Sequence, residues 1–344
     1  MPLVSAGSLF FSFLLLILSS LHFHALAQAA DSVETRAGLK RLEENKSAKR
    51  ILFIDSYHQS YSWSAGIVAG VRSILEPMAV EMKIFSMDSK RKSDADSIKQ
   101  AALRAKAEIE SWQPDLLIAS DDNASKYLIE PYYKNADLPV VFCGVNWDAS
   151  LYGYPYQNAT GMEEISLIAP LPKELLRFAK GNRLGILSGN VLSDRQNVSN
   201  YIRKAGVVFD KRIFVSNVEQ WQEAFLRLQN EVDMLILENS MSISGWEKET
   251  MHQFIMQHTK IPSGTTQARM IPYVLLGFLQ VPEEQGQYAA KTALRILAGE
   301  SPDAIPIVNN QRVNASVNLD MAEKLGVIFE IGFLRNAQTY RWKN

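Results

Sequence analysis

The feature that most constrains this chain is a regular alternation of short apolar runs and amphipathic stretches, which begins near residue 50. The apolar runs have few polar interruptions, as is typical of strands buried on both faces of a parallel sheet. The amphipathic stretches repeat their apolar residues at helical spacing. Together they predict strands over 51–54, 81–85, 115–119 and 139–143, and helices over 63–75, 94–112 and 124–133.

The same alternation restarts after a loop rich in Gly, Tyr and Asn at 144–161. It predicts strands over 183–187, 212–215 and 233–237, and helices over 194–205 and 220–229. We therefore predict an α/β fold with two doubly wound parallel-sheet lobes, a hinge and an interlobe cleft. We place the main crossover at 145–162. The first lobe would hold 50–158 plus about 280–300, and the second lobe 160–279 plus about 305–344, with a returning helix over 282–298.

The N-terminus carries a short apolar run at 9–18 that ends in small residues. This pattern predicts a signal peptide over residues 1–29, cleaved near Ala27 or Ala29. The run is preceded by no Lys or Arg, so an uncleaved anchor is the alternative. No later segment reaches the ~20 apolar residues that a membrane-spanning helix needs. We expect a periplasmic protein, and its single Cys143 cannot form an internal disulfide.

Charge and motifs argue against several classes of function. With 36 Lys+Arg against 37 Asp+Glu, the chain has no strong field to attract nucleic acid. The sequence contains no G-x-S-x-G elbow, no Walker lysine loop and no G-x-G-x-x-G after the first strand. His252 and His258 are spaced so that they would not face one metal ion. We expect no catalysis, cofactor or metal; an exported α/β enzyme is the less favoured class.

Polar loops follow the predicted strands, and ligands of parallel sheets bind beyond the carboxyl ends of the strands. Side chains that hydrogen-bond or stack on a small polar molecule are concentrated in these loops. The candidate ligand-binding residues are Tyr57, His58, Tyr61, Trp63, Asp121, Asp122, Asn123, Asn146, Trp147, Glu163, Asn190, Glu238 and Asn239.

Structural roles are open for several of these residues. Asp122 and Asn123 are also suitable helix caps. Tyr57, Tyr61 and Trp63 could pack the start of the following helix as a hydrophobic staple. A ligand role and a structural role therefore both stand for these five residues.

Several segments resemble the ABC transporter substrate-binding family, and within it the branch found as extracellular sensor regions of bacterial histidine kinases. The resemblance rests on ILFIDSYHQSYSW at 51–63, MDSKR at 87–91, PDLLIASDDNA at 114–124, VVFCGVN at 140–146, NATG at 158–161, PEEQG at 282–286 and NLDMAEKLG at 318–326. The chain departs from transporter relatives at 279–282, where LQVP stands in place of a Tyr-Gly-x-Asp run.

The resemblance implies a type I periplasmic-binding fold that closes on a small molecule. We expect a monomeric solute-binding protein that presents a polar, aromatic or amine-bearing ligand to an ABC-type permease. In the alternative reading, the chain is a periplasmic adaptor that senses a ligand for a membrane signalling receptor. Both functions need the same ligand-binding residues.

Overall fold

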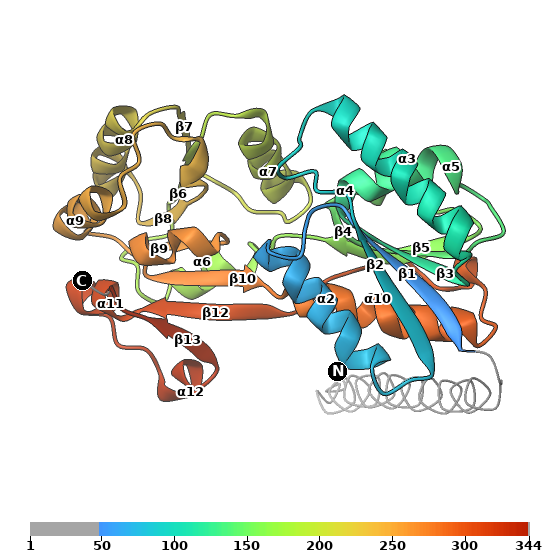
Figure 1. Ribbon diagram of the computed structural model, residues 1–344. Helices are drawn as coiled ribbons and strands as arrows, with labels where there is room; N and C mark the ends of the chain where they lie inside the picture. Colours follow the sequence, from blue (N-terminus) through green and yellow to red (C-terminus); the bar gives the residue numbers. More distant parts are fainter. Residues whose placement is uncertain (1–47, 343–344) are drawn as a thin grey trace, which may run out of the picture. The chain divides into compact units, whose positions relative to one another are not determined.

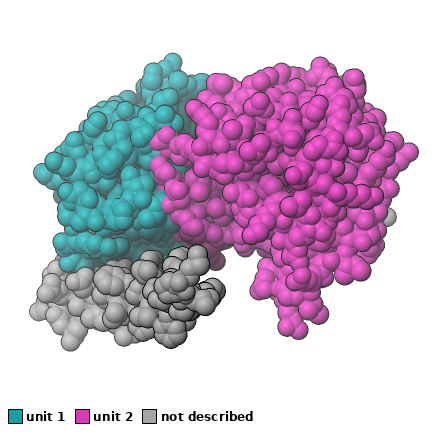
Figure 2. All heavy atoms as spheres, turned by 180° about the vertical axis from the view of Figure 1, so that it is seen from behind, with its two compact units in different colours: residues 1–145, 149–162, 285–308 teal, residues 146–148, 163–284, 309–344 magenta. Residues whose placement is uncertain are grey.

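The computed structural model describes residues 48–342, so the predicted signal peptide lies outside the described residues. The chain forms two compact α/β units, shown in different colours in Figure 2. Unit 1 contains the described residues up to Val145, together with Ala149–Met162 and Gln285–Val308. Unit 2 contains Asn146–Asp148, Glu163–Glu284 and the described residues from Asn309.

The sheet of unit 1 has the strand order β11-β5-β4-β3-β1-β2. β1 pairs in parallel with β2 and β3, and β3 pairs in parallel with β4. Its strands are β1 (Lys49–Asp55), β2 (Val80–Ser86), β3 (Leu116–Ser120), β4 (Val140–Asn146), β5 (Ala159–Glu164) and β11 (Val308–Asn309). Its helices are α2 (Ser62–Leu75), α3 (Ala95–Trp112), α4 (Asp121–Ala124), α5 (Glu130–Tyr132) and α10 (Pro282–Leu297), with a π-helical turn η1 (Ser125–Ile129) and 3₁₀ turns η2 (Ala149–Tyr152) and η5 (Pro302–Ala304).

Successive side chains of the unit 1 strands enter two different cores, because neighbouring side chains of a strand point to opposite faces. Leu52 and Ile54 pack with α3 and the η1 segment, whereas Ile51 and Phe53 pack with α2 and α10. The sheet is thus covered on both faces, which explains its uninterrupted apolar strands (Figure 1). Gly286 lets α10 approach α2 closely, since a Cβ there would lie 1.9 Å from the Ile67 carbonyl oxygen.

The sheet of unit 2 has the order β13-β12-β10-β9-β8-β6-β7. Its strands are β6 (Leu184–Gly189), β7 (Lys211–Val215), β8 (Met234–Leu237), β9 (Ser263–Thr265), β10 (Leu276–Gln280), β12 (Val313–Asn318) and β13 (Ala337–Tyr340). Its helices are α6 (Pro170–Leu175), α7 (Leu192–Arg203), α8 (Val218–Glu231), α9 (Lys248–His258), α11 (Leu319–Leu325) and α12 (Ile331–Leu334), with 3₁₀ turns η3 (Ser240–Ser242) and η4 (Ala268–Tyr273). One continuous core fills this unit.

The predicted fold class of two doubly wound, mostly parallel α/β lobes is confirmed, with three local differences. The predicted loop at 144–161 is partly strand, because β4 extends to Asn146 and β5 begins at Ala159. The helix predicted from residue 124 begins earlier, at Asp121. β12 runs antiparallel to β10, with Gln280 opposite Val313, because the chain re-enters unit 2 at the edge where β10 ends.

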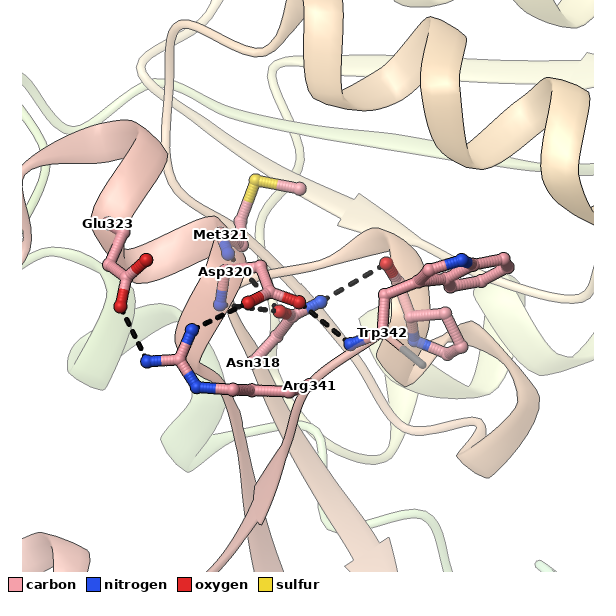
Figure 3. Close-up of polar contacts among 7 residues, drawn as sticks. Asn318, Asp320, Met321, Glu323, Arg341 and Trp342 are labelled. Carbon is pink, nitrogen blue, oxygen red and sulfur yellow. Dashed lines mark hydrogen bonds and ion pairs between the residues drawn. The ribbon is translucent and has the colours of Figure 1, made fainter. Parts of the chain in front are cut away.

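The C-terminal segment is tied to unit 2 by a polar cluster (Figure 3). Arg341 Nη1 donates to Asp320 Oδ1 at 2.7 Å, and the backbone N–H of Trp342 donates to Asp320 Oδ2 at 2.7 Å. The Trp342 indole stacks on His252, with ring centroids 3.9 Å apart, and burial lowers the pKa of that histidine. The last described residues therefore belong to the folded unit. Within 48–342 no helix has the length and apolar character needed to span a bilayer.

Candidate ligand-binding site

Three loops of unit 1 begin side by side at the carboxyl ends of β1, β3 and β4. Asp55 lies opposite Ser120 in the parallel register, and Ser120 lies opposite Cys143. The side chain of Ser56 joins two of the loops, because its hydroxyl donates to the Ser120 carbonyl and accepts from the N–H of Ala124 at 2.8 Å. The strand register thus brings the predicted residues of three loops to one edge of the sheet.

The buried carboxylate of Asp55 holds the first of these loops. Its Oδ1 accepts from the Tyr57 N–H at 2.9 Å and from the Ser64 hydroxyl at 2.8 Å. Its Oδ2 accepts from the Gln59 amide at 2.9 Å. Asp55 is fully buried, so it positions the tyrosines of the loop rather than presenting itself to a ligand.

Asp121 is buried at 1% exposure and adopts a left-handed backbone with φ +68°. Its Oδ1 accepts from Trp63 Nε1 at 3.1 Å, and its Oδ2 accepts from the Ser120 hydroxyl at 2.7 Å. Burial raises the pKa of Asp121 to about 8, and the neighbouring charges of Asp122 and Asp55 add to this effect. The carboxyl group is therefore mostly protonated at neutral pH, and it fixes the Trp63 indole at this edge.

The aromatic residues of the first loop form a half-exposed cluster. The rings of Tyr57 and Tyr61 meet edge to face with centroids 5.3 Å apart. The ammonium of Lys90, from the loop after β2, lies 4.2 Å from the Tyr57 centroid and 5.0 Å from the Tyr61 centroid. His58 contacts Tyr61 at 6.2 Å between ring centroids. This surface combines aromatic rings with a cation that lies over two of them.

Asp122 and Asn123 lie half-buried beside this cluster, in the first turn after β3. Asn123 Nδ2 donates to the Ser89 hydroxyl at 2.8 Å, which links it to the loop after β2. The Tyr152 hydroxyl hydrogen-bonds to Asp122. Ser120 is the residue before α4, and no side chain caps that helix start, so the structure gives these two residues partners other than the helix N-terminus.

Unit 2 also carries a buried acid at the end of β8, an inner strand of its sheet. Glu238, at 4% exposure, follows β8, and its Oε1 accepts from the N–H of Thr266 at 2.8 Å. The Tyr201 hydroxyl lies 3.4 Å from Glu238 Oε2 and 3.1 Å from the Thr266 hydroxyl. Burial raises the pKa of Glu238 to about 7, so both protonation states are populated near neutrality.

Most of the other predicted residues of unit 2 already have structural partners. Asn239 Nδ2 donates to the buried carboxylate of Asp194 at 2.7 Å, as does the Ser242 hydroxyl. Gly189 is required beside them, since a Cβ there would lie 1.7 Å from the Ser242 hydroxyl. Asn190 accepts from the Arg195 guanidinium at 2.6 and 2.9 Å. These asparagines hold loops together.

The remaining predicted residues lie around the end of β4 and on β5. Trp147 is buried at 6% exposure against Tyr201, and its Nε1 lies 3.3 Å from Asn197 Oδ1. Asn146 is exposed at the end of β4, and Glu163 is half-buried on β5. Trp147 is therefore part of the unit 2 core and not an open stacking surface.

The structure brings six predicted residues of unit 1 together in a half-exposed group, which we call the unit 1 cluster: Tyr57, His58, Tyr61, Trp63, Asp122 and Asn123. Sequence reasoning missed Lys90 and the supporting roles of Asp55 and Asp194. Lys90 could have been found from its position in the loop that follows β2, which is also a parallel strand. Nothing in the sequence distinguishes a loop aspartate that binds a ligand from one that binds its own loop.

Comparison with solved structures places this fold in the class of type I periplasmic-binding-protein-like folds. A ligand-free, open substrate-binding protein with adhesive properties from Clostridium difficile matches with TM-score 0.66 and 17% identity, covering 86% of this chain and all of that one. A domain from Streptococcus pneumonia in complex with L-Trp has the same identity and coverage with TM-score 0.55. A conserved domain protein from Vibrio cholerae has TM-score 0.53, again at 17% identity and 86% and 100% coverage.

Residues 62–340 match the family described as ABC transporter substrate binding protein. The chain belongs to this family, so the resemblance to the substrate-binding family is confirmed, whereas the finer resemblance to sensor regions of histidine kinases stays a prediction. No match was found among curated proteins.

Proposed function

We propose that this chain is an exported solute-binding protein that binds a small aromatic, amine-bearing molecule and presents it to an ABC-type permease. The observation that carries the ligand assignment is the unit 1 cluster. Its six side chains come from loops after neighbouring parallel strands and stay half-exposed, while buried Asp55 and Asp121 hold those loops in place. Such convergence of polar and aromatic groups on a rigid scaffold is typical of small-molecule sites.

The chemistry of the cluster supports a ligand that carries both charges and a ring. The half-exposed carboxyl group of Asp122 is suited to accept hydrogen bonds from an ammonium group. Lys90, which lies over two tyrosine rings, is suited to meet a carboxylate at the edge of an aromatic surface. An aromatic amino acid combines these features, and the L-Trp complex of the structurally similar Streptococcus domain supports the same class.

In unit 2, buried Glu238 and its neighbours Thr266 and Tyr201 would support the strand-end loops, as Asp55 and Asp121 do in unit 1. Glu238 and Thr266 directly follow β8 and β9, which corresponds to the position of the unit 1 cluster in its own sheet, and Tyr201 reaches them from α7. The ligand-bound form would then be the form that a membrane partner recognises. This part of the proposal rests on family membership and on the equivalent strand ends.

A matched ligand series tests the proposal. L-Tryptophan carries all three groups. Tryptamine lacks its carboxylate, indole-3-propionate lacks its amine, and L-leucine lacks the aromatic ring. A ligand present at a hundred times its Kd stabilises a protein by about 2.7 kcal/mol, which gives a clear shift in Tm. We expect L-tryptophan to give the largest shift in Tm, and tryptamine a smaller one because it lacks the carboxylate that Lys90 would meet. The two compounds that lack the amine or the ring should shift the Tm less than tryptamine. If no member of the series shifts the Tm, the ligand assignment is wrong.

The export proposal has its own test. Residues 1–29 have the apolar run and the small-residue cleavage pattern of a signal peptide. We expect N-terminal sequencing of the protein from a periplasmic extract to begin near Gln28 or Ala30. Recovery of the intact chain from the membrane fraction would instead support the uncleaved anchor. Cross-linking in the same cells would show whether the membrane partner is a permease or a signalling receptor.

A further inference from the structure

A cavity lies in unit 2, at the opposite ends of its strands from the loops that carry the candidate ligand-binding residues. Its volume is about 380 Å³, within the range of small-molecule sites. Arg183, Asp233 and Pro262 line it, and each of them directly precedes a strand, namely β6, β8 and β9. Glu238 and Thr266 lie at the other ends of β8 and β9. The cavity is therefore separate from the candidate ligand-binding residues of unit 2.

The charged lining of this cavity is positive. Arg183 is paired with Asp233, with its Nε 3.0 Å from one carboxylate oxygen and its Nη2 3.1 Å from the other. Lys180 and Lys260 are exposed, and within residues 48–342 neither ammonium forms an ion pair with a carboxylate. The only hydrogen bond found for the Lys260 ammonium in this part of the chain is a long one, 3.4 Å, to Asn230 Oδ1. Two positive charges thus remain uncompensated at the rim.

A buried amide supports the wall of this cavity. Gln229 also lines the cavity and is 5% exposed. Its Oε1 accepts from the backbone N–H groups of Lys260 and Ile261, at 2.8 and 3.2 Å, which fixes the orientation of the amide. Its Nε2 is buried without a hydrogen-bond partner in the described part of the chain. This donor is enclosed by protein atoms and does not open into the cavity, so the amide supports the backbone of residues 260–261 at the cavity wall.

Apart from Asn230, the rest of the lining is apolar and includes Phe178, Leu325 and Val327. A bare inorganic anion would leave this surface in contact with water, whereas a hydrocarbon or aromatic body would cover it. We propose that this cavity is a second binding site, which takes a small carboxylic acid with an apolar body. Lys180 and Lys260 hold the carboxylate, and the apolar lining holds the body.

Phenylacetate and its neutral isostere phenylacetamide test the proposal by calorimetry on the full chain, with inorganic phosphate as a third probe. We expect phenylacetate to bind, and phenylacetamide and phosphate each to bind at least about tenfold more weakly, because each lacks one of the two recognised features. Tight binding of phosphate with no preference for phenylacetate would overturn the assignment of an apolar body. Absence of phenylacetate binding at millimolar concentration would overturn the site itself.

Variants then locate the binding. Lys180→Met and Lys260→Met keep the aliphatic stems of two exposed side chains, so both variants should fold. Each should weaken phenylacetate binding about three- to tenfold, and the double variant more. Lys248→Met is the matched control, because Lys248 is also exposed in unit 2 but begins α9 and does not line the cavity. Equal binding by the double variant and the control would show that phenylacetate binds elsewhere and would refute the proposal.

Discussion

The two units share one architecture but differ in the side chains that their strand-end loops carry. In unit 1, β1 pairs in parallel with β2 and β3, and in unit 2, β6 pairs in parallel with β7 and β8. A buried acid directly follows the third of these strands in chain order, Asp121 after β3 and Glu238 after β8. Around Asp121 the polar and aromatic loop residues remain half-exposed. Around Glu238 the asparagines bind Arg195 and Asp194. The comparison suggests that the acid is a shared support, while unit 1 carries most of the ligand selectivity.

The largest expected effect concerns the pH dependence of stability. The folded pKa of Asp121 is about 8 against an ordinary value near 3.8, so between these values the folded chain keeps a proton that the unfolded chain loses. The free energy of unfolding should therefore fall as the pH rises from about 4 to about 8. The full shift corresponds to a loss on the order of 5 kcal/mol. Asp121→Asn, which resembles the protonated acid, should remove this fall in urea unfolding experiments.

Glu238→Gln is the matching variant in unit 2. The folded pKa of Glu238 is about 7 against an ordinary value near 4.5, so its contribution should be smaller, on the order of 3 kcal/mol, and should end near neutral pH. Parent and both variants are compared by urea unfolding from about pH 4 to pH 9. If the free energy of unfolding changed with pH equally in the parent and in the Asp121 variant, the Asp121 carboxyl would ionise as in the unfolded chain. Asp121 and Glu238 would then not have the same supporting role.

The fold could be predicted from the sequence because its signals are local. The uninterrupted apolar run at 51–54 indicates a strand that is buried on both faces, and the structure has β1 there. The helical spacing of apolar residues after Trp63 indicates a helix that is buried on one face, and the structure has α2 there. The reversal of β12 could not be predicted in this way. The direction of β12 depends on where the chain re-enters unit 2, and the sequence of residues 313–318 does not indicate that point.

The candidate site is predictable only in part, for a different physical reason. The rule that ligands bind beyond the carboxyl ends of parallel strands identified the loops of Tyr57 and Asp122. The same rule also selected Asn190 and Asn239, whose amides bind groups of their own unit. Whether a polar loop residue faces outward depends on distant partners, such as the room that Gly189 leaves for Ser242 and Asp194. A single sequence does not show those contacts.

A second prediction contrasts a half-exposed acid of unit 1 with an asparagine of unit 2. Asp122→Asn keeps the size of the side chain and its ability to bind the Tyr152 hydroxyl but removes the charge. Charge-assisted hydrogen bonds are worth about 1.5–3 kcal/mol, so binding of tryptamine should weaken roughly ten- to a hundredfold. Stability should change by less than about 1 kcal/mol, because Asp122 caps no helix.

Asn190→Ala provides the control for this measurement. Asn190 is exposed in a strand-end loop of unit 2, after β6, but its side-chain oxygen binds Arg195. Calorimetry should give the same tryptamine affinity for this variant as for the parent. Equal losses in the two variants would mean that unit 2 contributes to selectivity as strongly as unit 1, contrary to the comparison.

The smallest expected effects separate two tryptophans that have similar hydrogen bonds but different exposure. Trp63 is half-exposed and donates to Asp121 at 3.1 Å, whereas Trp147 is buried and donates to Asn197 at 3.3 Å. Replacement by Phe removes one hydrogen bond in each case, at a cost of about 1 kcal/mol. Only Trp63→Phe also removes aromatic area from the unit 1 cluster, so we expect a several-fold loss of tryptamine affinity for that variant alone. Chemical unfolding and calorimetry on the same two samples make this test, and a loss of affinity confined to Trp147→Phe would move the aromatic recognition surface to unit 2.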